Sequence, residues 1–270
     1  MNQHYVWKLC LSSLILYTQS FTVLAEIIPD PCAGPSPLLN LIDRPTVGDS
    51  ACVVPYKKAI LEMGYQYQSL SHSAGNEQNF PEAELRIGLP LNNELVMILP
   101  SNIHQSMAPH SGFTATVVGI KHELGYNKSW LWTIEALLTQ SNGSAAFGSK
   151  GNGAAFNGIV SYNINSSFNL TFMFGGTTQT QAIQSGGQRY NSINPDLILT
   201  YTATNKLQFF GEVYGQSKTG PGEGSGFNFD GGLLYLLIPN FSVDLEVGQR
   251  ISGNLFGFDH YIGTGVGILF

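Results

Sequence analysis

The chain is poor in charge and has no long hydrophobic run beyond its first residues. Only 11% of its 270 residues are charged, whereas an ordinary soluble domain has about 25%. A membrane-spanning helix needs about 20 consecutive apolar residues, and the sequence after residue 25 contains no such stretch. These two shortages disfavour both an ordinary soluble domain and a helical membrane protein.

Cysteine is scarce as well, and the three cysteines fall near the N-terminus. The first residues carry Lys8, then an apolar stretch, then small residues that end at Ala25. This order is typical of a signal peptide, so residues 1–25 are predicted to be removed on export. Export leads to an oxidising compartment, and we therefore expect a disulfide between the remaining Cys32 and Cys52. Their spacing fits no zinc site.

Basic patches and clustered metal ligands are also lacking. The formal net charge of −6 gives no electrostatic basis for binding nucleic acid, which favours basic surfaces. The six histidines are scattered along the sequence, and the loops hold no group of carboxylates that would suit calcium. We expect no metal, no cofactor and no nucleic-acid partner.

From about residue 58 onward, segments of about ten residues alternate between apolar and polar side chains. Short turns that contain asparagine alternate with longer polar loops, so each pair of segments is predicted to form a hairpin. The predicted strands span 58–70, 82–89, 94–101, 113–124, 129–140, 153–164, 168–178, 190–203, 206–217, 226–238, 241–252 and 258–270. Twelve strands with short turns on one side and longer loops on the other are typical of bacterial outer-membrane barrels.

Aromatic residues recur where strands meet the short turns, as an interfacial girdle requires. They are Trp130, Phe168, Phe241 and Phe270. A soluble sandwich would show the same alternation of faces but would not need this rim. The sequence therefore predicts an all-β fold, a twelve-stranded antiparallel transmembrane β-barrel in the cell outer membrane. It would span residues 58–270 and follow a periplasmic N-terminal segment, residues 26–57.

The last strand also carries an assembly signal. Gly265, Ile268 and the terminal Phe270 resemble the C-terminal insertion signal of outer-membrane proteins. We expect this strand to pair with the first one, because a bilayer offers an unpaired edge no hydrogen-bond partner. The expected partners are outer-membrane lipid and, through this strand, the barrel-assembly machinery.

Three stretches resemble an exported family named for the MetA pathway of phenol degradation. They are LIDRPTVGDSACVVPYKKAILEMGYQY (41–67), PEAELRIGLPLNNEL (81–95) and GIKHEL (119–124). The shared features include Asp43-Arg44-Pro45, Val54-Pro55 and the Glu-x-Gly of residues 62–64. The resemblance implies an outer-membrane transporter with a link to aromatic-compound catabolism. It supplies no catalytic residues.

One short motif resembles part of an enzyme active site. Ser141-Asn142-Gly143 reproduces the second half of the His-x-Ser-Asn-Gly motif of outer-membrane phospholipases. The position of the histidine is occupied by Thr139, which cannot act as a general base. We therefore expect a loop at this point and no enzyme.

Period two predicts which charged side chains face the lumen, since charge facing lipid costs about 2–4 kcal/mol for Arg or Lys at mid-bilayer. The set comprises Glu62, Glu84, Arg86, Glu94, Lys121, Glu123, Glu135, Asp196, Glu212, Asp230, Asp244, Glu246 and Arg250. We expect Arg86 and Arg250 to pair with inward carboxylates rather than to bind a solute. The excess of acids predicts selectivity for cations and neutral molecules. It should be strongest near the short turns, where Glu123, Asp244 and Glu246 are expected to cluster.

The predicted function is an outer-membrane channel for the passive passage of small solutes, with aromatic or apolar compounds as the class that the resemblance implies. A twelve-stranded barrel is intermediate in size between small barrels filled by side chains and large open porins. The strand number therefore leaves both a filled lumen and an open one possible. A narrow conduit is the interpretation we favour. The alternatives are a structural barrel, an adhesin or anchor with a plugged lumen, and a lipid-modifying enzyme.

Overall fold

The regular part of the chain forms one antiparallel sheet. The structure is a computed structural model that describes residues 29–34 and 36–270, so the predicted signal peptide lies outside the described residues. The strands are β1 (Ala59–Leu70), β2 (Asn76–Phe80), β3 (Glu84–Leu89), β4 (Asn93–Ile98), β5 (Asn102–Gln105), β6 (Ser111–Phe113), β7 (Val117–Tyr126), β8 (Trp130–Thr139), β9 (Gly153–Asn163), β10 (Phe168–Thr180), β11 (Arg189–Thr204), β12 (Leu207–Gln216), β13 (Gly226–Ile238), β14 (Phe241–Ser252) and β15 (Phe258–Leu269). The helical elements are α1 (Pro37–Leu41) and the 3-10 turns η1 (Ser71–Ser73), η2 (Ile183–Ser185) and η3 (Leu255–Gly257).

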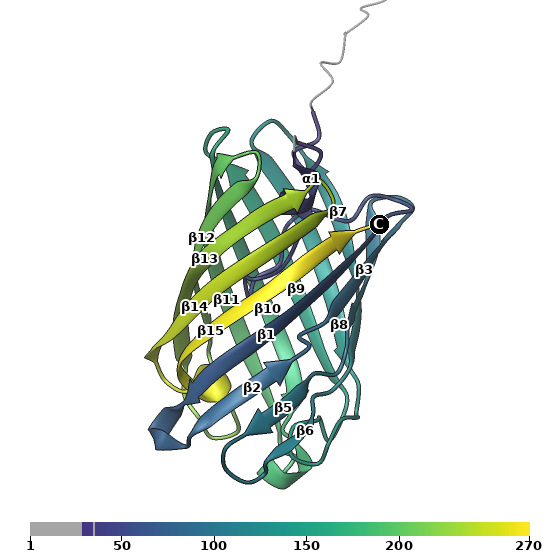
Figure 1. Cartoon of the computed structure of the whole chain (residues 1–270). Helices are drawn as coiled ribbons and strands as arrows, with labels where there is room; N and C mark the ends of the chain where they lie inside the picture. The colour runs from purple at the N-terminus through teal and green to yellow at the C-terminus, as the bar shows by residue number, and fades with distance from the viewer. Residues whose placement is uncertain (1–28, 35) are drawn as a thin grey trace, which may run out of the picture.

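The sheet closes into a barrel through its first and last strands. β15 pairs with β1 from Ile60↔Leu269 to Leu70↔Phe258, and the amide of Phe270 donates to the carbonyl of Ala59 at 2.8 Å. We call this pairing the seam. It confirms the predicted twelve-stranded antiparallel barrel, which Figure 1 shows as a ring of tilted strands with the long loops at the lower end.

Three of the twelve barrel strands are interrupted. β2 and β3 form the second, β4 and β5 the third, and β6 and β7 the fourth, with β2, β5 and β6 at the long-loop end (Figure 1). The sequence predicts loops over residues 71–81 and 101–112. This prediction is wrong in part, because the structure has the short strands β2, β5 and β6 there. Pro81 and Pro100 lie at two of the breaks, where they lack the amide hydrogen that a ladder needs. The short pieces are polar, so they carry no apolar alternation.

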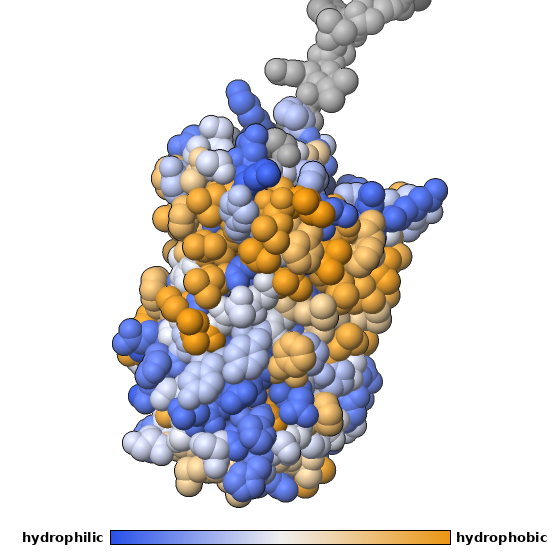
Figure 2. All heavy atoms as spheres, in the orientation of Figure 1, coloured by the Kyte–Doolittle hydropathy of each residue, from blue (hydrophilic) through white to orange (hydrophobic). Residues whose placement is uncertain are grey.

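The outer face of the barrel is apolar over the end that holds the short turns. Figure 2 shows hydrophobic residues gathered over the upper part of this face and hydrophilic ones around β2 below. On β12, Phe209 and Val213 are 39% and 41% exposed, whereas Glu212 between them is 1% exposed. At the short-turn rim the Trp130 ring lies 4.5 Å from that of Tyr162. The outside is therefore built to face lipid.

The segment before β1 lies inside the barrel rather than apart from it. Figure 1 shows α1 and the chain that follows it within the ring of strands. Leu38 and Leu41 of α1 are 0% and 1% exposed and join a core with Leu131, Ile159 and other inward residues of the wall. The sequence predicts a separate periplasmic segment over residues 26–57. The two-residue alternation that identifies strands gives no information about the position of a segment without regular structure. We call the described part of this segment, up to residue 57, the plug.

None of the helices within the described residues is long and apolar enough to cross a membrane.

The position of the apolar band can be tested with arginine on the outer face of β14. Leu245 lies near the middle of the strand and Ile251 near its long-loop end, and both are exposed. Leu245→Arg should lower the free energy of unfolding by about 2–4 kcal/mol, and Ile251→Arg by about 1 kcal/mol or less. Urea unfolding in lipid vesicles measures both. Equal costs would contradict the placement of the band.

Candidate functional site: a plugged lumen

Buried ion pairs join the plug to one wall of the barrel. Arg86 on β3 binds Asp43 of the plug through Nη1 to Oδ2 at 2.9 Å and Glu94 on β4 through Nε to Oε1 at 2.8 Å. Lys121 on β7 lies 3.3 Å from the same Asp43 oxygen. Glu62 on β1 completes the group, 3.4 Å from Arg86. The two basic side chains are 0% exposed, so these charges are paired with one another away from water.

The same side chains also bind the backbone of the plug. Arg86 donates to the carbonyl oxygens of Leu41 and Cys52. Glu62 accepts from the amide of Arg44 at 2.7 Å, and Glu94 accepts from that of Val54 at 2.6 Å. Buried amides and carbonyls that lack secondary structure need such partners. Much of the inward charge on β1, β3, β4 and β7 is thus engaged in holding the plug.

Burial shapes the titration of Asp43. Desolvation raises the pKa of its carboxyl to about 6, against the opposing pull of Arg86 and Lys121. The positive charges of Arg86 and Lys121 favour the ionised form of this carboxyl. A desolvated charge with two partners is costly to leave half-paired, which ties the plug to this wall.

Arg44 fixes the plug to the seam. Its guanidinium lies 3.0 Å from Glu82, just before β3, and 3.4 Å from Asp244 on β14. It crosses the seam over a pair of facing glycines, since a Cβ at Gly64 would lie 2.2 Å from Arg44 and one at Gly265 would lie 2.4 Å from it. Only glycine leaves room for this approach.

The tip of the plug, residues 46–48, reaches the opposite wall. Glu212 on β12 accepts from the amides of Val47 at 2.9 Å and Gly48 at 2.7 Å. A Cβ at Gly48 would lie 2.7 Å from the carboxylate of Asp196 on β11, so the backbone here rests directly on the wall. Two backbone amides that donate to one carboxyl group satisfy backbone donors of the tip and form its latch to this wall.

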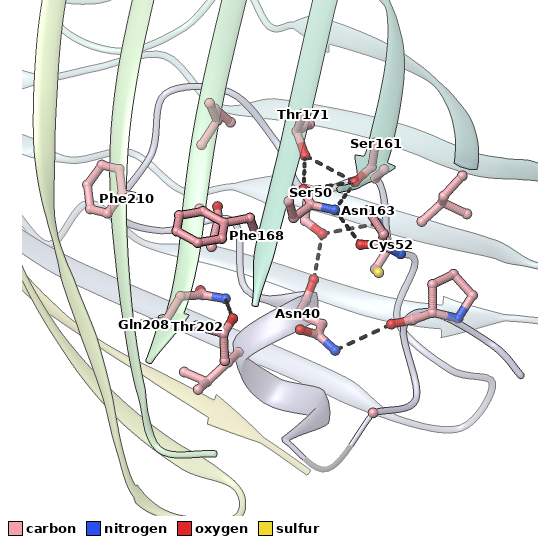
Figure 3. A pocket seen from close by; sticks show the side chains of 18 of the residues that line it. Asn40, Ser50, Cys52, Ser161, Asn163, Phe168, Thr171, Thr202, Gln208 and Phe210 are labelled. Atoms are coloured by element: carbon pink, nitrogen blue, oxygen red, sulfur yellow. Dashed lines mark hydrogen bonds between the residues drawn. The ribbon is translucent and has the colours of Figure 1, made fainter. Parts of the chain in front are cut away.

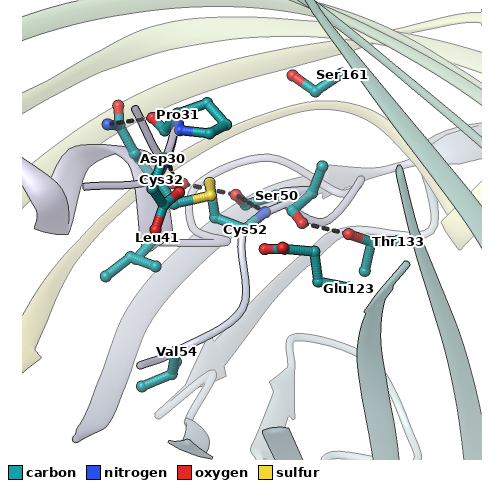
Figure 4. Close-up of a disulfide and its surroundings, with 12 residues drawn as sticks. Asp30, Pro31, Cys32, Leu41, Ser50, Cys52, Val54, Glu123, Thr133 and Ser161 are labelled. Carbon is teal, nitrogen blue, oxygen red and sulfur yellow. Dashed lines mark hydrogen bonds between the residues drawn. A yellow bond between two sulfur atoms is a disulfide. The ribbon is translucent and has the colours of Figure 1, made fainter. Parts of the chain in front are cut away.

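A disulfide closes the base of the plug. Cys32 and Cys52 are bonded, with their Cα atoms 5.6 Å apart, and both are 6% exposed. Figure 4 shows the bond between α1 and the strands, with Thr133 donating to the neighbouring Ala51 carbonyl. The covalent loop of residues 32–52 contains α1, Asp43, Arg44 and the tip. Most of the contacts described above therefore belong to one closed ring of chain, and that of the Val54 amide lies just beyond it.

Two chambers flank the plug tip along β9 to β12. The inner chamber, about 590 Å³, opens among the short turns and is lined by polar residues such as Ser161, Thr171 and Gln208 (Figure 3). The outer chamber, about 130 Å³, lies toward the long loops beside Asp196 and Tyr214. Along β12 the inward residues run from Gln208 and Phe210 in the inner chamber, through Glu212 at the latch, to Tyr214 and Gln216 in the outer one.

The structure sorts the predicted lumen charges into separate groups. Glu62, Glu84, Arg86, Glu94 and Lys121 lie together on one wall, where Glu62 faces Glu84 across the ladder. Asp196, Glu212 and Asp230 lie on β11 to β13, with Glu212 directly opposite Asp230. Glu135 accepts from Asn157, and Arg250 pairs with Asp259 near the long loops.

One expected cluster is not formed. Asp244 and Glu246 share Arg44, but Glu123 lies on β7, across the ring, where it accepts from Asn92. Position along the strand placed all three near the short turns, yet it carries no information about their place around the ring. The three residues therefore do not form one local cluster.

Sequence reasoning missed the residues that the plug contributes. Asp43 and Arg44 entered only as part of a family motif, and Glu82, the first residue of the predicted strand 82–89, lies just before β3 and was not assigned to the lumen. The one available signal was the excess of inward acids, because a confined set of ten carboxylates against three basic residues calls for further cations. Arg44 is one of them.

No metal centre emerges from the described residues, and the serine of the Ser-Asn-Gly motif contacts backbone rather than a histidine. The described residues contain no group of three or more His, Cys, Asp or Glu side chains that could hold a metal ion. The hydroxyl of Ser141 donates to the carbonyl of Lys150 at 2.6 Å, in an exposed loop. This serine therefore serves a loop contact, in keeping with the turn expected there.

Comparison with known proteins gives a family and several similar folds. A family model described as "Putative MetA-pathway of phenol degradation" matches residues 42–256. The solved COG4313 outer membrane channel from Pseudomonas putida F1 is similar with a TM-score of 0.63 at 10% identity, over 83% of this chain and 100% of that one. The NanC porin is similar with a TM-score of 0.53 at 15% identity, over 78% of this chain and 98% of that one. The KdgM porin is similar with a TM-score of 0.53 at 11% identity, over 77% of this chain and 98% of that one. No curated protein sequence matches the chain.

The role of the buried network can be tested by comparing two arginines. Arg86→Met leaves Asp43, Glu62 and Glu94 short of a buried partner and should lower the free energy of unfolding by about 3–5 kcal/mol. Arg250→Met removes a partly exposed pair and should cost about 1 kcal/mol or less. Urea unfolding measures stability. Limited proteolysis of the plug segment reports whether the plug has left the barrel, because a bound plug is protected from cleavage. Similar losses for both variants would contradict the network.

Proposed function

The chain belongs to the family described as "Putative MetA-pathway of phenol degradation", and we propose that this outer-membrane barrel is a gated channel for the passive passage of small solutes. The observation that carries the proposal is the pair of chambers on one wall of the lumen, with the plug tip between them. The similar solved structures include an outer membrane channel and two porins, which supports a role in passage.

The two walls of the lumen differ in a way that suggests a route. On β1, β3, β4 and β7 the buried network fills the space between plug and barrel. On β9 to β12 the wall is lined by hydroxyl and amide side chains and leaves room for solutes. Displacement of residues 46–48 alone would join the chambers, while the disulfide and the network keep the rest of the plug in place.

The charges along this route favour cations and neutral molecules. Asp196, Glu212 and Asp230 make no ion pair with any residue in the described part of the chain. The basic residues Arg86 and Lys121 are engaged on the opposite wall. A confined passage with unpaired carboxylates repels anions. For the solute itself, the family description supports aromatic compounds.

A structural barrel with a permanently filled lumen is the second candidate. The buried network favours it, because ion pairs of this kind hold the plug firmly. The two functions make opposite statements about conductance, so one set of measurements decides between them.

Removing the latch should open the channel. Glu212→Ala loses two hydrogen bonds to the plug tip, each worth about 0.5–1.5 kcal/mol, and should raise the open probability in a planar bilayer about tenfold. Glu223→Ala is the matched control, since this carboxylate lies in an exposed outer loop and accepts from Thr219 of the same loop. If neither the natural protein nor Glu212→Ala conducts, the filled structural barrel is supported and the channel is not.

Ion selectivity tests the charge argument separately. Under a potassium chloride gradient, the reversal potential of the natural protein should show preference for potassium over chloride, and Asp196→Asn should weaken that preference. Glu223→Gln, in an exposed outer loop, should leave it unchanged. A preference for chloride would contradict the assignment of the route to the acidic wall.

A further inference from the structure

The outer chamber is lined by apolar and polar residues and by one carboxylate, that of Asp196. Val47 of the plug tip, Met173, Leu255 and Phe256 contribute apolar surface, and Asp196 with Tyr214 contributes polar groups. The rings of Tyr214 and Phe256 lie 6.0 Å apart in a tilted arrangement. Phe256 belongs to η3, which lies over the chamber on the long-loop side.

Two buried polar groups of this chamber lack a well-formed hydrogen bond within the described residues. Neither the carboxylate oxygens of Asp196 nor the hydroxyl of Tyr214 has an N–H or O–H partner in good geometry, although the Glu212 carboxyl lies beside Asp196, and Asn228 and Tyr261 lie beside Tyr214. Each of the two side chains is only 3% exposed. A buried polar group without a partner is costly. A ligand that donates hydrogen bonds would remove that cost at both groups at once.

The surroundings of Asp196 favour a positive ligand. Glu212 and Asp230 lie on the next two strands, and Glu212 is committed to the plug tip. Asp230 accepts from Tyr261 through one oxygen, and its other oxygen is free of protein donors among the described residues. Arg44, the basic residue of the plug's closed loop, is engaged by Glu82 and Asp244. Three neighbouring carboxylates with no cation among them attract one.

We propose that the outer chamber is a binding site for a small organic ammonium ion, with Asp196 accepting from its ammonium group and Tyr214 and Phe256 flanking its apolar body. The volume of about 130 Å³ is close to the roughly 150 Å³ of a cavity that accommodates benzene. Aromatic rings add attraction for a cation. The site rests on the proposed function in one respect, since it lies on the proposed route and names the solute class that enters it.

A proton shared between Asp196 and Glu212 would also relieve the crowded charge. That state needs no ligand and gives no selectivity for ammonium compounds. The two possibilities therefore differ in what the natural protein binds, independent of any mutation.

Calorimetric titration of the purified full barrel in detergent micelles tests the site without requiring conductance. The probes are benzylammonium, benzyl alcohol and benzoate, which share a ring and differ in charge, with empty micelles as the blank. Benzylammonium should bind saturably, and the other two at least about tenfold more weakly. Equal binding of the alcohol, or no saturable binding of benzylammonium, would overturn the site.

Variants locate the binding. Asp196→Asn should weaken benzylammonium binding about tenfold or more, Tyr214→Phe should weaken it less, and Glu223→Gln in the exposed outer loop should leave it unchanged. Unchanged binding in a folded Asp196→Asn barrel would overturn the assignment, and if that variant does not fold, the probe series on the natural protein decides. Binding without conductance of any solute would reject the proposed channel and leave this site standing. Conductance without binding would reject the site and leave the channel standing.

Discussion

The position of the plug depends on one guanidinium with no access to water. Arg86 is 0% exposed and binds Asp43, Glu62 and Glu94 together with the carbonyls of Leu41 and Cys52. A buried charge of this kind holds its partners in one geometry, because each partner removed leaves another unpaired. The barrel wall and the plug meet at this group. These contacts hold the plug against β1, β3 and β4. The space that remains in the lumen lies on the other side of the plug, along β9 to β12.

The barrel could be predicted from the sequence because lipid imposes a simple rule. Alternation along β8, β10 and β14 gave their faces, and the short turns gave the hairpins, so most strand bounds agree with the structure to within a few residues. The breaks at Pro81 and Pro100 were missed, since the polar pieces β2 and β5 lie beyond the apolar band, where the rule does not apply. The closing pair of strands was predicted because a bilayer leaves a barrel no alternative.

The interior could be predicted only in part. Period two assigns Glu62, Arg86 and Glu212 to the lumen, but it cannot say which of them meet, because neighbours around the ring are set by closure and stagger. The separation of Glu123 from Asp244 illustrates this. The plug escaped altogether, since a segment without regular structure is specified by individual contacts such as that of Arg44 over Gly64 and Gly265. An inward charge read from sequence is therefore as much a candidate for holding a chain as for selecting an ion.

The distribution of the plug's contacts also orders its assembly in time. Asp43 binds residues of β3 and β7, which lie within the first third of the barrel in sequence, so these contacts close shorter stretches of chain than those to the late strands. The latch at Glu212 and the Arg44 contact with Asp244 join residues more than 160 positions apart and need the late strands. The first strands, curved around the buried charges, can thus gather the plug while the ring is still open. The remaining strands would then enclose a segment that the buried charges already hold.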